Sequence, residues 1–136
     1  MKTYAFRLHR GDDLRKSLEA FAQEHALRGA VILSCVGCLS HWRLRDASGV
    51  NLQEAEEHVE IVSATGTLSA ARLHVHISAS REDLTTLGGH LAYGCIVNTT
   101  AEIVLLELAN VSFTPQYDPE TGYEDCRCWL PDSSSC

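Results

Sequence analysis

The sequence has 136 residues, of which 45% are hydrophobic and 21% are charged. A chain of this size and composition can bury a core as one domain, and it does not match disordered, collagen-like or coiled-coil proteins. Its formal net charge is −7, from 11 basic and 18 acidic residues. Because proteins that bind DNA directly usually present a basic surface to the phosphates, this charge argues against a DNA-binding domain.

The sequence contains no segment typical of export or of a membrane span. Its beginning carries charged side chains (Lys2, Arg7, Arg10, Asp12, Asp13) and lacks the apolar segment of an export signal. No run of about 18 apolar residues occurs anywhere, so a membrane partner is not expected. We therefore predict a cytoplasmic protein, in which the six cysteines are free thiols or ligands rather than disulfides.

The first third of the sequence predicts a strand, a helix and a second strand. Residues 2–9 alternate between apolar and polar side chains, as a strand does. Asp12 is the expected N-cap of an amphipathic helix of about fourteen residues that ends near Gly29, with Asp13 in its first turn. Residues 30–39 are almost continuously apolar and rich in branched side chains, which predicts a strand buried on both faces.

The remaining sequence predicts further short strands. Residues 41–45 alternate, with Trp42 and Leu44 on one face, and precede a turn at residues 46–49. The pattern predicts strands at residues 58–68, 72–78, 90–97 and 102–109, with a bulge at Gly66 and a tight connection at residues 98–100.

From Ser112 onward we expect irregular structure, apart from a turn at residues 118–122 that contains Pro119 and Gly122. Short connections between successive strands favour antiparallel pairing. The predicted fold is therefore an α/β (α+β) domain, with a mostly antiparallel sheet of about seven strands and one main helix.

Three histidines form the strongest candidate site. His74 and His76 are two residues apart in a predicted strand, so their side chains point to the same face. His90 follows Gly88 and Gly89, which allow a close approach of the backbone, and begins the next predicted strand. If the two strands pair, three imidazoles converge, and they form a ligand set for a divalent transition metal with a fourth position open to water. The alternative is three separate polar residues on a solvated face.

Other polar residues are weaker candidates for a chemical role. Glu60 and Glu102 lie at or near strand starts and could orient a ligating histidine or act as a general base. The simpler interpretation is that both are solvent-facing carboxylates. Arg43 and Arg45 could bind an anion, although solvated strand residues are again the simpler interpretation.

The cysteines do not form a clear redox or metal motif. Cys35 and Cys38 have CxxC spacing, but they lie in a predicted strand, where residues three apart face opposite sides. A redox pair normally begins a helix, so we interpret both as buried structural cysteines. Cys126 and Cys128 would share one face of an extended segment, and we treat them, with Cys136, as incidental.

Seven segments of the sequence form a recognisable series. They are residues 30–40 (AVILSCVGCLS), 44–49 (LRDASG), 59–68 (VEIVSATGTL), 74–78 (HVHIS), 88–94 (GGHLAYG), 98–104 (NTTAEIV) and 118–123 (DPETGY). In this order, and over nearly the whole chain, they resemble the plants and prokaryotes conserved (PPC) domain, also called the DUF296 family, and in particular its bacterial single-domain branch.

The resemblance implies a mostly antiparallel fold assembled as a homotrimer. Packing between subunits would also cover apolar strands that a single helix cannot cover. The resemblance further implies a metal site, with zinc as the metal, at the histidines that match His74, His76 and His90. We place one domain over residues 1–125 and an irregular C-terminal tail over residues 126–136. Plant relatives carry a basic AT-hook before the domain, and this sequence contains no such element.

Three functions follow from these observations. The preferred hypothesis is a trimeric binding or regulatory module that holds a structural or sensory metal and is associated with DNA through protein partners. The second is a protein that binds DNA directly, which requires a basic groove in the trimer despite the acidic total charge. The third is a zinc-dependent, hydrolase-like enzyme in which Glu102 or Glu60 acts as a base beside a zinc-bound water.

Overall fold

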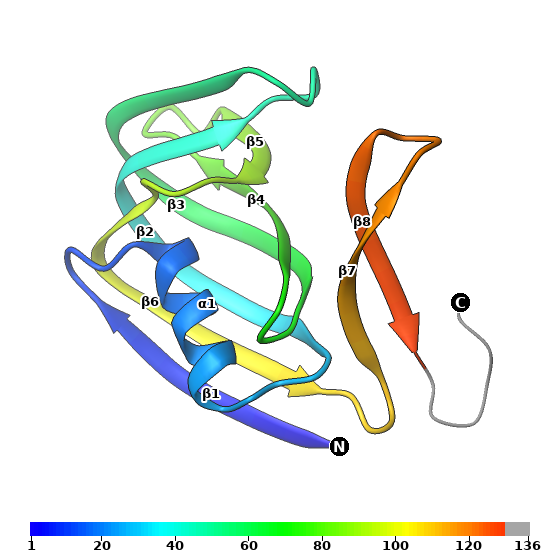
Figure 1. Ribbon diagram of the computed structural model, residues 1–136. Helices are drawn as coiled ribbons and strands as arrows, with labels where there is room; N and C mark the ends of the chain where they lie inside the picture. Colours follow the sequence, from blue (N-terminus) through cyan, green and yellow to red (C-terminus); the bar gives the residue numbers. More distant parts are fainter. Residues whose placement is uncertain (130–136) are drawn as a thin grey trace.

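A computed structural model describes residues 1–129 of the chain, which form one helix and eight strands (Figure 1). In chain order these elements are β1 (Lys2–His9), α1 (Leu14–Glu24), β2 (Ala30–Arg45), β3 (Leu52–Leu68), β4 (Leu73–Ser80), β5 (Thr86–Leu91), β6 (Ile96–Glu107), β7 (Ser112–Asp118) and β8 (Tyr123–Trp129). The helix α1 has 11 residues, and no helix in residues 1–129 is long and apolar enough to span a membrane.

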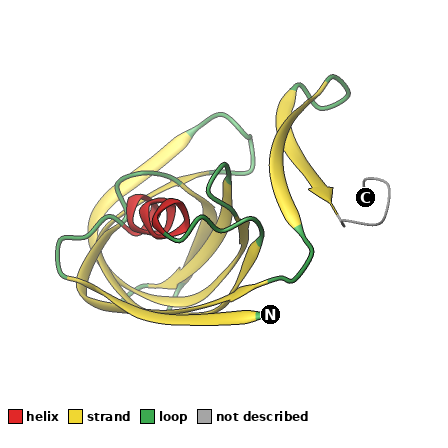
Figure 2. Cartoon of the chain, turned by 60° about the horizontal axis from the view of Figure 1, so that its bottom comes forward, coloured by secondary structure: helices red, strands yellow, loops and turns green. Residues whose placement is uncertain are grey.

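Six of the strands form one antiparallel sheet in the order β1-β6-β2-β3-β4-β5. β5 also pairs with the end of β2, where Arg45 lies opposite His90, so the strands from β2 to β5 form a closed ring of pairings. Figure 2 shows the sheet curving around the helix. The predicted fold class, a mostly antiparallel sheet with one main helix, is confirmed.

The helix packs one apolar face on the sheet. Leu14, Leu18 and Ala22 are each only 1% exposed and recur at the four-residue spacing of a single helix face. Burying large aliphatic side chains contributes roughly 1.5–3 kcal/mol each, so this face fixes the helix on the sheet.

The helix boundaries differ from those predicted. The N-cap is Asp13, whose carboxylate accepts from the Lys16 N–H at 3.0 Å and from the Gly94 N–H at 2.7 Å. Asp12, the predicted cap, accepts instead from the His9 N–H within the preceding turn. The helix ends at Glu24, earlier than expected, because His25 closes it with a backbone bond to Phe21.

β2 is one strand of 16 residues, with the two predicted strands joined through a register shift between Leu39 and His41. The predicted alternation at its end is confirmed, since Trp42 and Leu44 are buried. The prediction that residues 30–39 are buried on both faces is wrong for the single chain. Leu33 and Val36 are 55% and 53% exposed, because only one face of this strand packs against the core.

The boundaries of the later strands also differ. The predicted strand at residues 90–97 is divided by a turn at residues 92–95, where Gly94 adopts a φ of 105°. Residues 98–100, predicted as a connection, continue β6, and Thr100 pairs with His9 of β1. The bulge in β3 lies between Ile61 and Ser63 rather than at Gly66.

The segment after Ser112 is a β-hairpin rather than the predicted irregular tail. β7 and β8 pair along their whole length, with Ser112 opposite Trp129 at one end and Asp118 opposite Tyr123 at the other. The predicted turn at residues 118–122 joins them. Buried Phe113 anchors the hairpin to the body, since its N–H donates to the Arg28 carbonyl and its carbonyl accepts from the Ser69 hydroxyl at 2.7 Å. The proposed domain end at residue 125 therefore falls within β8. Cys136 lies outside the described residues.

Candidate metal centre

The structure brings together the three histidines that the sequence singled out. His74 and His76 lie on β4, and His90 lies on β5 directly opposite His76 in the antiparallel register. Along β4 the buried residues are Leu73, Val75, Ile77 and Ala79, so the intervening histidines point away from the core. The strand period alone therefore places two imidazoles on one face, and strand pairing adds the third.

Two glycines allow β5 to fit between β4 and β2. A Cβ on Gly88 would lie 2.9 Å from the Ile77 carbonyl oxygen, and a Cβ on Gly89 would lie 2.6 Å from the Arg45 carbonyl oxygen. Real Cβ atoms do not approach so closely. The expected role of these glycines in close backbone approach is confirmed, and it holds His90 beside His76.

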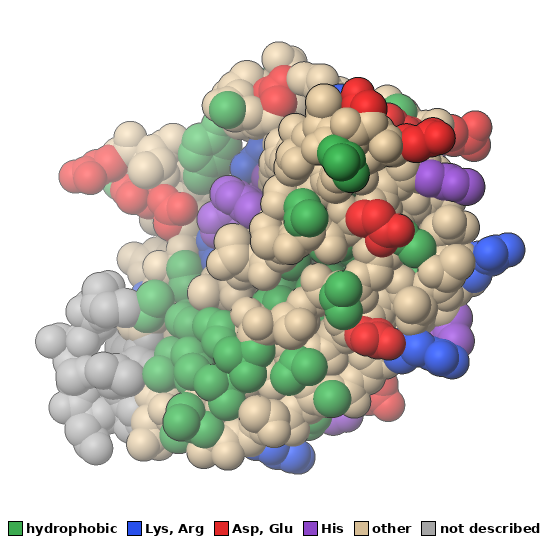
Figure 3. Space-filling model, turned by 180° about the vertical axis from the view of Figure 1, so that it is seen from behind, with side chains coloured by type: hydrophobic (Ala, Val, Ile, Leu, Met, Phe, Trp, Pro, Cys, Tyr) green, Lys and Arg blue, Asp and Glu red, His purple; other side chains and the backbone are tan. Residues whose placement is uncertain are grey.

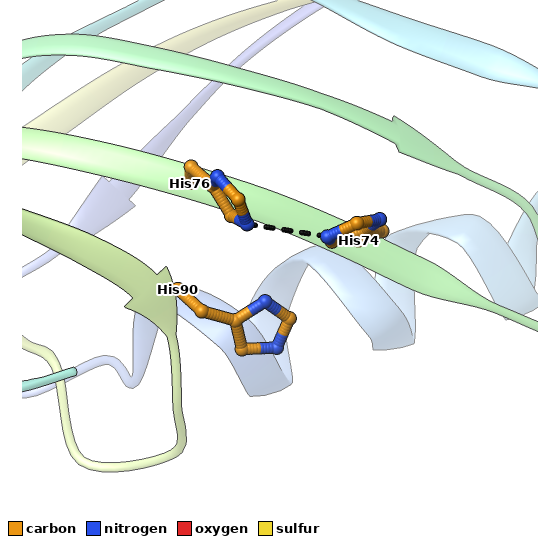
Figure 4. Close-up of side chains that lie close together, drawn as sticks. All are labelled: His74, His76 and His90. Carbon is orange, nitrogen blue, oxygen red and sulfur yellow. Dashed lines mark hydrogen bonds between the residues drawn. The ribbon is translucent and has the colours of Figure 1, made fainter. Parts of the chain in front are cut away.

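The three rings face one another (Figure 4). The Nε2 atoms of His74 and His76 are 3.2 Å apart. The centroid of the His90 ring lies 5.3 Å from that of His74 and 5.4 Å from that of His76. One nitrogen from each ring can be chosen so that all three lie within 4.8 Å of one another, and no other such group of ligand side chains occurs in residues 1–129.

The surroundings favour neutral imidazoles at two of the three positions. Burial, with a further contribution from the charge of Arg45, lowers the pKa of His90 to about 4. Burial also lowers the pKa of His74, and the charges of Arg72, His76 and Arg45 act in the same direction. A neutral imidazole is the form that ligates a metal, so these two rings are in the ligating form at neutral pH.

The geometry fits a zinc ion. Two ligands of a tetrahedral zinc at a Zn–N distance of 2.0–2.1 Å lie about 3.3 Å apart, and the His74 and His76 nitrogens are separated by 3.2 Å. The buried Nδ1 of His90 has no hydrogen-bond partner among the described residues. A buried polar atom without a partner carries a free-energy cost, and coordination of a metal would remove that cost.

Two arginines lie beside the histidines. An Arg72 Nη2 lies 3.4 Å from His74 Nδ1, and because a guanidinium only donates, this nitrogen of His74 is the acceptor. Neutral His74 then carries its proton on Nε2, and this N–H donates a hydrogen bond to Nε2 of His76. Arg45, opposite His90, has a buried Nε with no hydrogen-bond partner in the described part of the chain.

A pocket of about 620 Å³ opens beside these side chains. His74 and His90 form one wall with Arg45 and Arg72, and α1 contributes Arg15 to the rim. The tip of the β7–β8 hairpin contributes three further lining residues (Tyr123, Glu124, Asp125). The volume lies within the range of small-molecule sites.

The two carboxylates proposed as helpers do not lie with the histidines. Glu60 is exposed and pairs with Ser80, four residues along β4 from His76. Glu102 is exposed on β6, opposite Arg7 and Val36. Neither residue lines the pocket described above. The acidic residue whose charge acts on His74 is Asp125, on the hairpin that the sequence did not predict.

The cysteines are placed apart from this centre. Burial raises the pKa of the Cys35 thiol to about 11, as expected for a structural cysteine. Cys38 is less buried, and its sulfur lies 2.9 Å from the Thr99 hydroxyl. Cys126 and Cys128 share one side of β8, with their sulfurs 3.8 Å apart.

The sequence model of the Plants and Prokaryotes Conserved (PCC) domain family matches residues 1–109. The bifunctional protein GlmU of Synechococcus sp. strain JA-3-3Ab is 39% identical over 123 residues, which are 90% of this chain and 20% of that protein. The chain thus spans about a fifth of the length of the curated relatives it matches.

Several solved structures have the same fold. A hypothetical protein from Salmonella enterica has a TM-score of 0.91 and 34% identity, with 96% of this chain and 94% of that chain covered. A candidate DNA-binding protein from Bacteroides thetaiotaomicron has a TM-score of 0.81 and 26% identity, with 91% and 90% covered. A metal-containing protein from Archaeoglobus fulgidus has a TM-score of 0.77 and 26% identity, with 96% and 94% covered.

The resemblance noted in the sequence is confirmed by this agreement of family match and fold. The chain belongs to the Plants and Prokaryotes Conserved domain family, abbreviated PPC or PCC.

Proposed function

We propose that this protein is an oligomeric PPC-domain binding or regulatory module that holds one divalent transition-metal ion, zinc, on His74, His76 and His90. The observation that carries the proposal is the convergence of the three rings, with ligand atoms within 4.8 Å of one another. Imidazole nitrogen suits zinc and its neighbours in the first transition row better than calcium or magnesium, which prefer oxygen. The relative from Archaeoglobus fulgidus, described as metal-containing, supports the same conclusion.

The metal content of tag-free protein tests this proposal. We expect about one zinc or other first-row transition metal per chain by inductively coupled plasma mass spectrometry, since the three histidines form one ligand set. Tag-free protein is required because a polyhistidine tag binds the same metals. Protein that carries no transition metal, and that takes up none after dialysis against zinc, would contradict the proposal.

The oligomer we propose is a homotrimer. Leu33, Val36 and Val62 are 55%, 53% and 58% exposed, and they lie on the neighbouring strands β2 and β3. Viewed from behind, the molecule has hydrophobic side chains gathered on one part of its surface (Figure 3). Exposed apolar groups on adjacent strands are typical of a surface that packs against another subunit. Copies of the same chain are the partners that the family resemblance implies.

The oligomeric state and its dependence on Val36 test the trimer. Sedimentation velocity at micromolar concentration is expected to give a mass of about three chains. Val36→Asp is expected to shift the protein toward monomers, because it places a charge in the apolar contact. Val50→Asp is the matched control, since Val50 is 75% exposed in the turn after β2 and lies outside this contact. A monomeric wild type, or equal effects of both variants, would contradict the trimer.

We assign the association with DNA to protein partners. The relative from Bacteroides thetaiotaomicron, described as a candidate DNA-binding protein, supports some connection with DNA. The chain itself has a formal net charge of −7, and phosphate neutralisation supplies most of the affinity of direct binders. Partners that bring the module to DNA reconcile these two observations.

A hydrolase-like enzyme is the second candidate, favoured by the pocket of about 620 Å³ beside the three histidines. A zinc ion with three histidine ligands can bind and acidify a water molecule. The chain would have to supply a base within reach of that water. Glu60 and Glu102 lie elsewhere, and Glu19 at the pocket rim is already bonded to Arg15 and to the Tyr93 hydroxyl. The other carboxylates that line the pocket are Glu124 and Asp125 at the hairpin tip, so one of these would have to act as the base.

A further inference from the structure

We propose that the pocket beside the three histidines binds a small organic anion, whose carboxylate or phosphate group is held by Arg45 and Arg72. The proposal deepens the proposed function, because it names the ligand class of the same site. The two arginines do not require the metal in order to attract an anion, so the two proposals can fail separately.

Arg45 is the first of the two cations. It lies at the end of β2, opposite His90, and it lines the pocket. Its Nε is buried, yet this N–H has no hydrogen-bond partner in residues 1–129, and no ion pair involves its guanidinium there. Only this Nε is enclosed, since Arg45 as a residue is half-buried and lines the pocket, and a carboxylate or phosphate accepts charged N–H bonds from a guanidinium. Arg45 thus presents an unused anion-binding group to the pocket.

Arg15, which lines the same pocket, has hydrogen-bond acceptors for its guanidinium, unlike Arg45. It donates to Glu19 at 3.0 Å and to the Leu91 carbonyl at 2.8 Å, and its guanidinium lies 4.7 Å from the centre of the Tyr93 ring. This network neutralises Arg15 and fixes α1 against the turn after β5. The formal charges that line the pocket balance, with Arg15, Arg45 and Arg72 against Glu19, Glu124 and Asp125, but among the described residues only Arg15 is held in an ion pair. Arg45 and Arg72 are therefore the cations left to meet a ligand.

Arg72 is the second cation. It makes no ion pair with an acidic side chain in the described part of the chain, and its nearest recorded contact is 3.4 Å to His74 Nδ1. If His74 uses Nε2 as a metal ligand, its remaining proton sits on Nδ1, which then cannot accept from Arg72. The guanidinium must turn away, and the pocket that it lines is beside it. Metal binding and anion binding are therefore compatible at this residue.

The hairpin tip indicates the chemistry of the ligand beyond its anionic group. Glu124 and Asp125 line the pocket too, together with Tyr123. Carboxylates accept hydrogen bonds and do not donate them, so they suit a ligand with hydroxyl or amino groups at its other end. The tip comes close to the β2–β3 turn, since a Cβ on Gly49 would lie 3.0 Å from the Tyr123 hydroxyl. The expected class is a small hydroxylated anion, such as a hydroxy acid or a sugar phosphate.

Titration with defined probes tests this inference. The probes are L-malate for a carboxylate ligand, inorganic phosphate and glucose 6-phosphate for a phosphate ligand, and erythritol as a neutral control. Each is added to metal-free and to zinc-loaded protein at low ionic strength, with binding followed by calorimetry and by the ¹H–¹⁵N signals of the arginine Nε–H groups. The Arg45 signal is assigned by its absence in Arg45→Gln, and its shift reports contact directly.

We expect at least one anionic probe to bind both protein forms and to shift the Arg45 signal. Arg45→Gln and Arg72→Gln should each weaken binding about tenfold, because each removes a charged hydrogen-bond donor. Arg7→Gln is the control, since it removes one positive charge from an exposed position on β1. Arg45→Lys keeps the charge at β2 but loses the planar fork, and is expected to bind with intermediate affinity.

The outcomes separate the two proposals. Zinc binding without any anion binding would overturn this inference and leave the metal centre intact. Anion binding that is unchanged in both Arg45→Gln and Arg72→Gln, or equally weakened in Arg7→Gln, would also overturn it. Anion binding in a protein that takes up no metal would support the inference while contradicting the metal centre. The stronger of malate and the phosphates identifies the anionic group.

Discussion

Replacing His74 and His76 together with alanine is expected to abolish metal binding. The double variant retains only His90, and a single imidazole cannot hold a zinc ion against dilution, since structural and catalytic sites use three or four protein ligands. The bound metal should fall from about one ion per chain to a level near zero. Zinc is expected to raise the melting temperature of the wild type by binding its folded state, and this increase should be absent in the double variant.

A second pair of histidines provides the matched control. His9 and His58 are both exposed, on β1 and β3, and neither belongs to the three-histidine group. The His9→Ala, His58→Ala double variant removes the same number of imidazoles and should keep full metal content. An unchanged stoichiometry in the His74→Ala, His76→Ala protein, or an equal loss in the control, would show that the metal is bound elsewhere.

Gly37→Ala is expected to destabilise the fold strongly. Gly37 lies in the middle of β2, paired with Ile61 of β3 and Ala101 of β6. A Cβ at this position would collide with the Thr100 carbonyl oxygen and would lie 2.6 Å from the Ala101 Cα. These are backbone atoms of a central pairing, so the strands must separate. We expect a loss of at least about 3 kcal/mol in the free energy of unfolding.

Urea denaturation of Gly37→Ala and of Gly122→Ala measures this effect. A Cβ on Gly122 meets nothing within 4 Å, although its φ of 77° is unfavourable for alanine. The control should therefore lose only about 1 kcal/mol, the cost of backbone strain. Similar losses in both variants would mean that the close contact of β2 with β6 does not limit stability.

The sheet and the helix were predictable because their patterns are local. Alternation places Trp42 and Leu44 on a buried face, and the spacing of Leu14, Leu18 and Ala22 gives one helix face. Boundaries were less predictable, because they depend on partners elsewhere in the chain. Asp13 rather than Asp12 caps α1 because it also accepts from the distant Gly94.

The β7–β8 hairpin was missed because its sequence alternates weakly. Its place is fixed by Phe113, which is 8% exposed, and by bonds from Phe113 to Arg28 and Ser69. These partners are far from it in the sequence. The exposure of Leu33 and Val36 was likewise not predictable. A run of apolar residues indicates burial, but it does not show whether the same chain or another subunit covers them.

The three-histidine centre was predictable and its surroundings were not. The spacing of His74 and His76 gives one strand face, and the expected pairing with the next strand adds His90. Arg72 and the hairpin tip reach the same pocket from a loop and from a later strand pair. Arg45 had been considered for anion binding, but its unpartnered Nε is a property of the folded chain only.

We propose three roles for neighbouring parts of the fold. The histidines of β4 and β5 would hold a metal, and Arg45 and Arg72 would hold an anion in the pocket beside them. The exposed apolar residues of β2 and β3 would contact other subunits. Each role uses a different set of side chains, so each can be removed by substitution without removing the others.

Anomalous X-ray scattering from crystals of the zinc-loaded protein tests the metal centre most directly. Data collected on both sides of the zinc absorption edge locate the ion independently of any assumed ligand. We predict one strong peak per chain, at bonding distance from a nitrogen of His74, of His76 and of His90. A peak at other residues, or the absence of a peak between these rings in zinc-loaded crystals, would contradict the account.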